Sequence, residues 1–481
     1  MSTETKNIIK NISWLTGSEI AGMLMSAMGV FFLARALGDS EFGKYGFVIA
    51  FVSLFAVFTE FGFPLLFISD ISKNKTLLQK YIDNILAIKI ILGISAVGII
   101  LLFISFSNKD ASIKFLTLLT AINIVIGSFT GFFYAIFRAH EKMKFEAIFK
   151  AIQNMLLFIL ILFVFFSHRT LTQFVQYALL ITLIHLFLVF IFTQIKFIPF
   201  RLGFDFKFWK SLLISAFPLA LSSVFVSIYY NLDSVMLSFW KTDEVVGWYN
   251  AAYKIIFLLL AFVTIFHSTI YPVLSRLIIQ DPEKAKFLLK FSLKITIVLG
   301  MPIMVIISVL AAPIIKILFG AQFLGASLGL SVLIWTLFVS SLGIIYGNTL
   351  LAIGMRRRYA VIVGVGAITN VILNFMLIPS FSLVGAAVAT VAAECAVLFL
   401  MYTHFNNQIF PLPFLCYFPK PFFISIILGG ATYYLYLSGV NFFFILFFDI
   451  LVYPIALIVV KGVTRDDIIF LKNLYVRHAT T

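Results

Sequence analysis

The sequence predicts an all-α integral membrane protein with about fourteen transmembrane helices. Of its 481 residues, 62% are hydrophobic and 11% are charged, whereas a soluble domain has about 45–50% apolar and ~25% charged residues. The apolar runs are continuous, without the two-residue alternation of a membrane barrel. The loops between them are too short for a catalytic, nucleotide-binding or nucleic-acid-binding domain.

Each predicted span is a run of about 19 apolar residues bounded by short charged loops. The first run is too long for the apolar core of a signal peptide, and no cleavage site follows it, so we expect it to be retained. After the last run, Thr464-Arg465-Asp466-Asp467 is typical of a capping box that opens a short surface helix. The predicted spans are 11–37, 43–69, 82–107, 114–137, 148–167, 173–195, 210–239, 247–275, 288–312, 326–353, 359–379, 383–403, 419–438 and 441–461.

Positive charge predicts the orientation of these spans. The formal net charge is +15, from 35 Lys and Arg against 20 Asp and Glu. With the N-terminus inside, 25 of the 35 cations fall in cytoplasmic segments, six in outer loops and four inside spans. This asymmetry obeys the positive-inside rule and predicts that both termini are cytoplasmic. The basic loops therefore indicate topology and contact with anionic lipid rather than binding to nucleic acid.

An internal repeat predicts two equivalent lobes. Gly43 and Tyr45 follow the first span as Gly247 and Tyr249 follow the seventh. Six spans per repeat give both halves the same orientation, which implies a pseudo-two-fold axis along the membrane normal. We therefore predict a six-helix N-lobe at 1–203, a six-helix C-lobe at 204–407, two additional helices at 408–462 and a cytoplasmic tail at 463–481. Such lobes are typical of a transporter.

Enzymatic machinery is not visible in the sequence. No phosphate-binding G-x-x-x-x-G-K-[ST] loop and no H-E-x-x-H motif occurs, and the six histidines are scattered. Cys395 and Cys416 form neither a CxxC pair nor a disulfide framework. We therefore expect no catalytic residues, metal or organic cofactor, and a driving force from an ion gradient, the membrane potential or the substrate gradient.

Ionisable residues inside the spans are the candidate functional residues. A charge at the centre of a span costs about 2.5–3.5 kcal/mol on insertion scales, so such groups usually face a cavity or a partner. Arg35 and Lys294 lie close enough to a span end to snorkel. Glu394 and Asp449 are expected to form structural pairs. The other candidates are the cations Lys89 and Lys254 and the acids Glu19, Glu60 and Asp233.

Three sequence stretches have the pattern of a known family. They are FFLARALG with FGKY at 31–38 and 42–45, DSVML with VGWYNAAYK at 233–237 and 246–254, and NVILNFMLIP with GAAVAT at 370–379 and 385–390. These stretches resemble the polysaccharide-biosynthesis and O-antigen-type flippases of the multidrug/oligosaccharidyl-lipid/polysaccharide exporter superfamily. With the span count, the resemblance covers essentially the whole chain. It implies the MATE-like fold and transport of polyprenyl-linked oligosaccharides. The extra helix pair is similar to that of the fourteen-span lipid II flippases.

A flippase for a lipid pyrophosphate needs cations in its cavity, because they replace the water contacts that the phosphate oxygens lose. Arg35 and Lys254, from equivalent regions of the two lobes, are a candidate clamp. Beside Asp233, a polar stripe follows one face of its helix; it suits sugar hydroxyls, and equally interhelical hydrogen bonds. The predicted cavity residues are Arg35, Lys89, Lys254, Asp233, Asn231, Ser227 and Ser234, and the predicted ion-coupling acids are Asp233, Glu19 and Glu60.

The function predicted from these features is that of a monomeric, non-enzymatic flippase in the cytoplasmic membrane. It would carry a polyprenyl-pyrophosphate-linked oligosaccharide by alternating access, with proton or sodium as candidate coupling ions. Its partners would be this lipid, membrane lipids and a glycan polymerase or transferase, and no nucleic acid. The first alternative is a cation-coupled exporter of drugs or small metabolites. A membrane glycosyltransferase fits poorly, because such enzymes commonly have a sizeable outer loop and the outer loops of this sequence are short. A channel also fits poorly, because no re-entrant filter sequence occurs.

Overall fold

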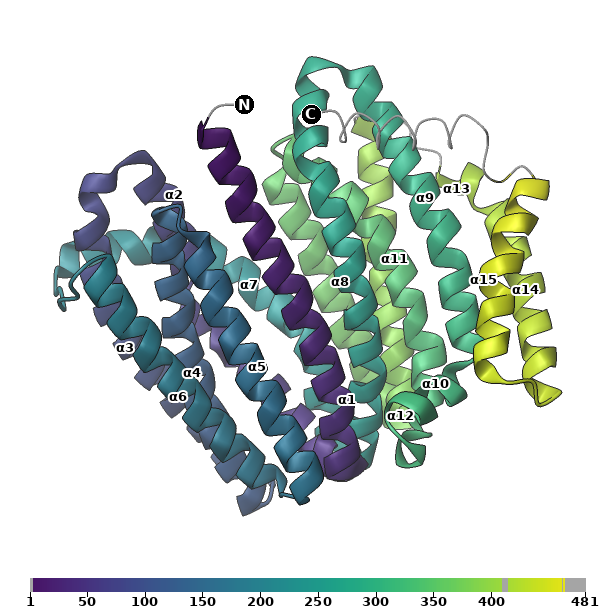
Figure 1. Cartoon of the computed structure of the whole chain (residues 1–481), viewed down its shortest axis with the longest axis horizontal. Coiled ribbons are helices and arrows are strands. Elements are labelled where there is room, and N and C mark those ends of the chain that lie inside the picture. Colours follow the sequence, from purple (N-terminus) through teal and green to yellow (C-terminus); the bar gives the residue numbers. More distant parts are fainter. Residues whose placement is uncertain (1–2, 409–413, 461, 463–481) are drawn as a thin grey trace. The chain divides into compact units, whose positions relative to one another are not determined.

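The computed structural model describes the backbone of residues 3–408, 414–460 and 462, and this part of the chain is almost entirely helical, without strands (Figure 1). The all-α prediction is therefore confirmed. The predicted tail at 463–481, with its surface helix, lies outside the described residues. The long helices are α1 Thr3–Glu60, α3 Leu78–Ser105, α4 Ala111–Ala139, α5 Met143–Ser167, α6 Leu171–Lys196, α7 Phe206–Trp240, α8 Asp243–Gln280, α9 Pro282–Val309, α11 Ala326–Ala352, α12 Arg356–Gln408, α14 Pro419–Leu437 and α15 Phe442–Val459. The short ones are α2 Phe63–Lys73, η1 Lys75–Leu77, α10 Ala311–Leu318, η2 Ala321–Phe323 and α13 Phe414–Tyr417.

Eleven segments of the described chain are long and apolar enough to cross a membrane. Two of them, Glu19–Lys73 and Arg356–Asn406, are 55 and 51 residues long, about twice the length that one crossing needs. Counting each of these twice gives thirteen crossings, and the 19-residue α14, which is not among the eleven, would complete the predicted fourteen. The chain is a multi-pass membrane protein.

Backbone breaks divide the long segments where the sequence predicts a loop or a turn. Gly38 (φ 82°) interrupts α1, and Ser382 (φ 55°) interrupts α12. A further break, which the hydropathy pattern did not predict, occurs inside the span predicted at 43–69, where Phe61 and Gly62 both have positive φ. Pro64 explains part of this break, because it has no N–H to donate to the carbonyl of Glu60. The predicted second span therefore comprises the last part of α1 and the first part of α2.

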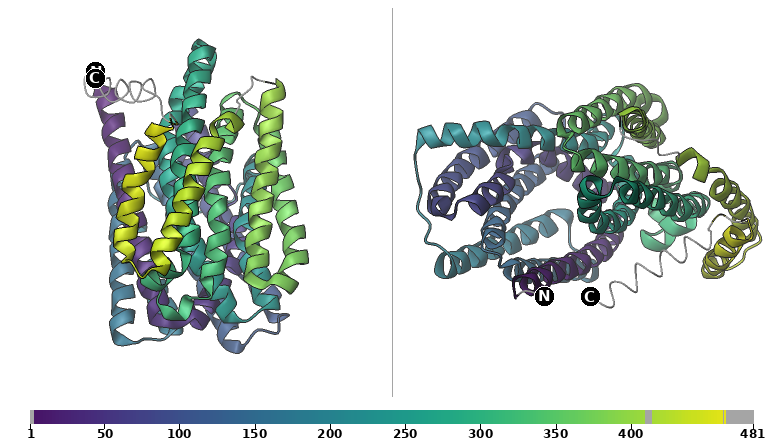
Figure 2. Two further views of the ribbon diagram at one scale, coloured as in Figure 1. Left: turned by 90° about the vertical axis from the view of Figure 1, so that its right-hand side faces the viewer. Right: turned by 90° about the horizontal axis from the view of Figure 1, so that it is seen from above.

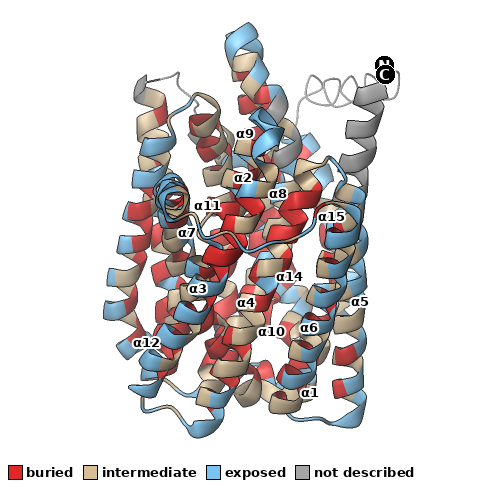
Figure 3. Ribbon diagram, turned by 90° about the vertical axis from the view of Figure 1, so that its left-hand side faces the viewer, coloured by how far each residue is buried: buried red, intermediate tan, exposed pale blue. Residues whose placement is uncertain are grey.

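The chain divides into two compact units, Met1–Asn250 and Ala251–Thr481. In unit 1, α1 packs along α5 and α7, while α4 packs against α6 and α3. Aromatic side chains fill its interior, among them the fully buried Phe67 and Phe132, whose ring centroids are 5.3 Å apart. Figure 3 shows exposed residues along the outward faces of α3 and α6. The predicted lobe boundary near 203/204 stays a prediction.

In unit 2, α11 packs on α9 and α12, and α9 also contacts α14. The additional helices α14 and α15 form a hairpin (Figure 2). The Tyr453 hydroxyl of α15 donates to the carbonyl of Val298 in α9 at 2.6 Å. Within the hairpin, the Thr432 hydroxyl donates to Asp449 at 2.8 Å. One hydrogen bond thus attaches the additional pair to α9, and a second one joins its two helices.

The two glycines of the predicted repeat contact each other reciprocally within unit 1. A Cβ added to Gly43 would lie 1.8 Å from the carbonyl oxygen of Asp243, and one added to Gly247 would lie 2.1 Å from that of Asp39. Each glycine therefore lies against the carbonyl four residues before the other glycine, and only glycine permits this approach. The contact explains why both segments carry glycine at this position. The pseudo-two-fold axis of the whole chain stays a prediction.

Candidate functional site

A polar cavity of about 270 Å³ lies within unit 1, among the end of the α1 helix, α4 and α7. Its one ionisable wall residue is Glu60. The hydroxyls of Ser128 and Ser223 donate to backbone carbonyls of their own helices, so their oxygens are left to act as acceptors. With the Glu60 carboxylate, the cavity is rich in hydrogen-bond acceptors. The cavity is lined by Ala56, Val57, Thr59, Glu60, Gly62, Ile124, Ser128 and Ser223.

The break after α1 positions Glu60. Because the helix ends at this residue, its side chain leaves the last turn toward α4 and lies against Gly131, where an added Cβ would be 3.8 Å from Oε1. The Glu60 side chain is exposed to the cavity. Within the part of the chain that the structure describes, its carboxylate makes no hydrogen bond and no ion pair. A carboxylate in this environment can bind a proton, a cation or a hydroxyl donor.

Lys89 lies behind the wall of this cavity. Its side chain is fully buried, and its Nζ donates to the carbonyl of Thr59 at 2.7 Å. Nζ also lies 5.5 Å from the centre of the Phe129 ring. The ammonium thus satisfies a carbonyl in the last turn of α1, where a positive charge also complements the helix dipole. Opposite charge couples Lys89 to Glu60 electrostatically.

The other two predicted coupling acids have protein partners. Asp233 is buried and accepts a hydrogen bond from the Tyr249 hydroxyl at 2.6 Å. Glu19 is exposed, and its carboxylate lies 3.7 Å from the Nζ of Lys150. Of the three acids, Glu60 is therefore the one on the wall of the described cavity. No group of three or more His, Cys, Asp and Glu close enough to hold a metal ion occurs among the described residues.

The predicted polar stripe of α7 makes hydrogen bonds within unit 1. The Ser227 hydroxyl donates to the carbonyl of Ser53 in α1 at 2.8 Å. Asn231 Nδ2 donates to the Ser227 carbonyl at 3.0 Å, and the Ser234 hydroxyl reaches Asn250 Oδ1 at 3.5 Å. The bonds of Ser227 and Ser234 join α7 to α1 and α8, the interhelical alternative for the stripe, whereas the bond of Asn231 lies within α7. A role of these residues in binding substrate stays a prediction.

The two cations of the predicted clamp belong to different compact units. Arg35 is exposed on α1 in unit 1, and Lys254 is half-buried on α8 in unit 2. The structure describes each of these side chains only relative to its own unit. The joint action of Arg35 and Lys254 on a pyrophosphate therefore stays a prediction.

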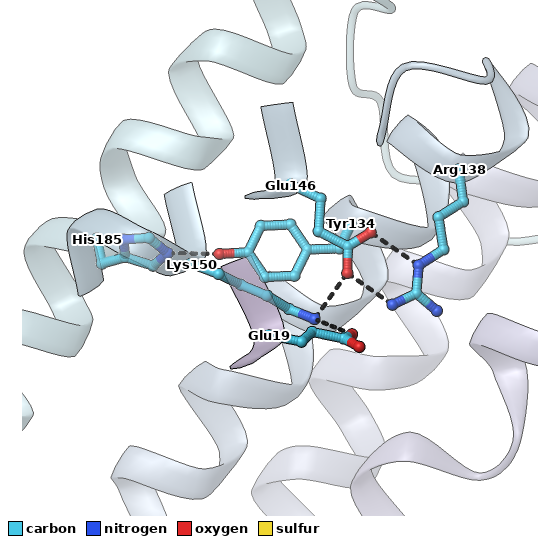
Figure 4. A network of polar contacts seen from close by, with 6 residues as sticks. All are labelled: Glu19, Tyr134, Arg138, Glu146, Lys150 and His185. Atoms are coloured by element: carbon cyan, nitrogen blue, oxygen red, sulfur yellow. Dashed lines mark hydrogen bonds and ion pairs between the residues drawn. The ribbon is translucent and has the colours of Figure 1, made fainter. Parts of the chain in front are cut away.

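A second polar cluster in unit 1 was not predicted from the sequence (Figure 4). Glu146 on α5 is fully buried, and both of its carboxylate oxygens are bound by Arg138 at 2.8 and 2.6 Å. Lys150 Nζ lies 2.8 Å from the same carboxylate and connects it to Glu19 on α1. This cluster joins α1, α4 and α5. The spacing of Glu146 and Lys150, four residues apart on one helix face, was the available signal.

Next to this cluster, Tyr134 and His185 form a buried pair, with the hydroxyl oxygen 2.8 Å from Nε2. The pair connects α4 with α6. Lys150 Nζ lies 5.7 Å from the centre of the Tyr134 ring, within the range of a cation–π contact. The charged cluster and the Tyr134–His185 pair are therefore neighbours. The positive and negative charges of the cluster balance one another. Together with the Tyr134–His185 pair, the cluster holds α1, α4, α5 and α6 together.

The fold and the acceptor-rich cavity inside membrane-spanning helices define a multi-pass membrane transporter. The sequence matches the polysaccharide biosynthesis protein family over residues 8–278, more than half of the chain. The chain therefore belongs to this family, in the multidrug/oligosaccharidyl-lipid/polysaccharide exporter superfamily. Residues 218–376 also match the MatE family. The family resemblance expected from the sequence motifs is confirmed.

Curated relatives match most of the chain. A putative O-antigen transporter of Escherichia coli is 25% identical over 85% of this chain and 99% of its own length. The capsular polysaccharide biosynthesis protein CapF of Staphylococcus aureus is 22% identical over 84% of this chain and its full length, 100%. A probable low-salt glycan biosynthesis flippase of Haloferax volcanii is 27% identical over 48% of this chain and 50% of its own.

Solved structures share the fold. The lipid II flippase MurJ in an inward closed conformation aligns with a TM-score of 0.77 at 18% identity, over 92% of this chain and 97% of that protein. An inward-facing MATE multidrug transporter aligns with a TM-score of 0.66 at 14% identity, over 80% of this chain and 95% of its own. At these identities the likeness shows the fold, and the MATE-like fold prediction is confirmed.

Proposed function

We propose that this chain is a flippase that carries a lipid-linked oligosaccharide across the cytoplasmic membrane. The observation that carries the proposal is the family match over residues 8–278, together with full-length relatives described as an O-antigen transporter and a capsular polysaccharide protein. The fold belongs to transporters, and the relatives are transporters and flippases, so the chain acts by moving its substrate rather than by transforming it.

The polar cavity of unit 1 supplies a surface for the glycan. Sugar hydroxyls are hydrogen-bond donors, and the oxygens of Glu60, Ser128 and Ser223 accept such bonds inside the membrane-spanning helices. The polyprenyl tail would stay in lipid, because exposing it to water is strongly unfavourable. Arg35 and Lys254 remain the candidate ligands of the pyrophosphate. Lys89 would support the cavity wall through Thr59 rather than contact the substrate.

Glu60 is the acid that best fits a coupling role. Its carboxylate lies on the cavity wall and makes no hydrogen bond and no ion pair among the described residues, so a proton or a sodium ion can bind there. Binding of a cation would remove the charge that faces Lys89 across the end of α1. Movement of the break at Phe61 and Gly62 would then follow loading of the site. The two lobes would alternate access around the substrate in each cycle.

The orientation and partners follow from the same proposal. The excess of cations in alternate loops supports cytoplasmic termini in the inner membrane. A monomer suffices, because the cavity is enclosed by helices of one chain. A glycan polymerase or transferase would use the translocated lipid.

A cation-coupled exporter of small molecules is the second candidate. The match of residues 218–376 to the MatE family favours it, as does an acidic, acceptor-rich cavity, which suits cationic drugs. The two candidates differ in what they require of Arg35 and Lys254. An exporter of cations has no use for these positive charges, whereas a flippase for an anionic lipid needs them.

The test is to deplete the chain in its host and to label lipid-linked oligosaccharide with a probe that reaches only the outer leaflet. The proposal expects the labelled pool to fall and the intermediate to accumulate on the cytoplasmic side, with recovery when the intact gene is restored. Arg35→Ala and Lys254→Ala should fail to restore it. An unchanged outer pool in a host without a second flippase would contradict the proposal and favour the exporter.

A further inference from the structure

A second cavity of unit 1, of about 440 Å³, lies among α3, α4, α6 and the loop that joins α6 to α7. Its volume is in the range of small-ligand sites, about 300–1,000 Å³. The wall is apolar except for Arg201. Its lining residues are Leu86, Ile90, Phe129, Phe133, Leu183, Leu186, Phe187, Phe190, Phe200, Arg201 and Leu202.

The loop that closes this pocket is fixed to α3. Asp83 accepts a hydrogen bond from the backbone N–H of Arg201 at 3.1 Å, and its own carbonyl accepts from Gly203 N–H at 3.1 Å. Asn84 Oδ1 accepts from the N–H of Asp205 and from the Trp209 indole, at 3.0 and 2.8 Å. These bonds hold the loop in place without help from a ligand.

Aromatic packing completes this wall. The ring of Phe200 stacks on Phe133 with centroids 5.1 Å apart and lies 5.2 Å from Phe190. On the side away from the unit interior, Ile90 and Phe187 are 39% and 62% exposed. In a chain that crosses the membrane, these side chains face hydrocarbon. The pocket therefore opens to the lipid phase.

Arg201 lies at the loop end of the pocket, where the apolar helices α3 and α6 give way to a basic cytoplasmic loop. Its side chain is exposed. In the described parts of the chain its guanidinium makes no ion pair, and the nearby Asp83 carboxylate is engaged by backbone and by Gln79 at 2.7 Å. A guanidinium next to a hydrocarbon pocket matches the phosphate of a lipid whose chain lies in the pocket.

We infer that this pocket binds one acyl chain of an anionic membrane phospholipid, whose phosphate pairs with Arg201. One guanidinium balances the single negative charge of a phosphodiester, whereas a polyprenyl pyrophosphate carries a second charge for which the pocket has no cation. The polar cavity is lined by α1, α4 and α7, and although α4 contributes to both cavities, they share no lining residue. The site is therefore a stationary lipid site, separate from the Glu60 cavity and independent of the proposed function.

The test is native mass spectrometry of the full-length protein with phosphatidylglycerol and phosphatidylcholine at equal concentrations. We expect preferential retention of phosphatidylglycerol. Arg201→Gln should reduce this preference about fivefold, the effect of one cation near a charged membrane surface. Leu183→Trp, which fills the pocket, should abolish retention of both lipids. An exposed cation outside the pocket, Lys207, and an exposed neighbour on α6, Leu180, provide the matched controls Lys207→Gln and Leu180→Trp.

Three outcomes would overturn the inference. Equal retention of the two lipids by the wild type would mean that Arg201 does not select an anionic headgroup over a zwitterionic one. A loss in Lys207→Gln as large as that in Arg201→Gln would assign the preference to general surface charge. Displacement of phosphatidylglycerol by an equal concentration of polyprenyl pyrophosphate would assign the pocket to the transported lipid instead. Thermal melting of each variant in detergent without added lipid identifies any that fail to fold, and Arg201→Met, which also removes the charge, then replaces Arg201→Gln.

Discussion

Two acids inside the membrane helices of unit 1 have opposite environments. Glu146 is fully buried and bound by Arg138 and Lys150. Glu60 lies on the wall of a polar cavity, and the neighbouring Lys89 donates to a backbone carbonyl instead of to the carboxylate. A charge inside a membrane helix is energetically unfavourable, and these two acids carry it in different roles. Glu146 holds helices together, whereas Glu60 has an accessible carboxylate that a ligand can neutralise.

The largest effect on stability is expected from Glu146→Gln, which changes the structural acid of the two. A neutral amide would leave Arg138 and Lys150 without their shared carboxylate. Removing one member of a buried ion pair typically costs 3–5 kcal/mol, and we expect about 3 kcal/mol because Arg138 is 37% exposed. The measurement is the free energy of unfolding in detergent.

Glu60→Gln is the matched control, since it makes the same chemical change at an acid that has no hydrogen bond and no ion pair in the described chain. Its free energy of unfolding should stay within about 0.5 kcal/mol of the wild type. Equal losses in the two variants would show that both acids are structural and would remove Glu60 from the candidate site.

Lys89→Met tests the support behind the cavity and has the next largest effect. The variant leaves the Thr59 carbonyl buried without a donor, which costs about 2 kcal/mol. The free energy of unfolding checks this value. Lys114 offers a control, since it also donates to a carbonyl near a helix end, that of Ser105 at 3.3 Å, but is exposed. Lys114→Met should be nearly neutral, and a similar loss in both lysine variants would argue against a special role for Lys89.

Transport by Glu60→Gln sharpens the functional side of the comparison. If Glu60 couples transport to a cation, the neutral variant should translocate lipid-linked oligosaccharide roughly tenfold more slowly, within the range of coupled sites. The measurement is the rate at which labelled lipid reaches the outer leaflet of proteoliposomes with and without an ion gradient. The variant should also lose its response to the gradient, and a normal response would exclude Glu60 as the coupling acid.

The sequence predicted the fold well because hydrophobicity alone decides which segments cross a membrane. Fourteen apolar runs correspond to the crossings that the structure provides. The hydropathy pattern did not predict the break at Phe61 and Gly62, because an apolar run continues through it, and Pro64 accounts for only part of the break. The additional pair α14 and α15 was predicted from two further apolar runs. Its contact with α9 through Tyr453 could not be predicted, because hydropathy does not say which helices pack against each other.

The candidate site was predicted only in part, for a similar reason. Charges are conspicuous in an apolar sequence, so the hydropathy pattern alone is enough to select Glu60 and Lys89. Their roles could not be assigned, since hydropathy does not say whether a charge meets a cavity or a backbone carbonyl. Glu146 was missed because it lies near a basic loop, where acids are ordinarily solvated. The clamp of Arg35 and Lys254 depends on how two compact units act together.

The smallest effect is expected at an exposed acid, Asp205, which extends the comparison to the surface. Lys80 Nζ lies 2.9 Å from its carboxylate, and this hydrogen bond holds the pKa of Asp205 below its usual range. A carboxyl with a lowered pKa in the folded state stabilises the protein above its unfolded pKa, and this contribution disappears as the pH falls through the folded pKa. Wild type and Asp205→Asn should therefore differ slightly in melting temperature at about pH 6, and the difference should shrink as the pH falls below about 3.9, the ordinary pKa of Asp. Asp281, which pairs with Lys284 at 2.6 Å in unit 2 and also has a lowered pKa, should behave in the same way in Asp281→Asn. A difference that persists at low pH would mean that Asp205 acts through the hydrogen bond that its side chain accepts from the N–H of Phe208 rather than through its charge.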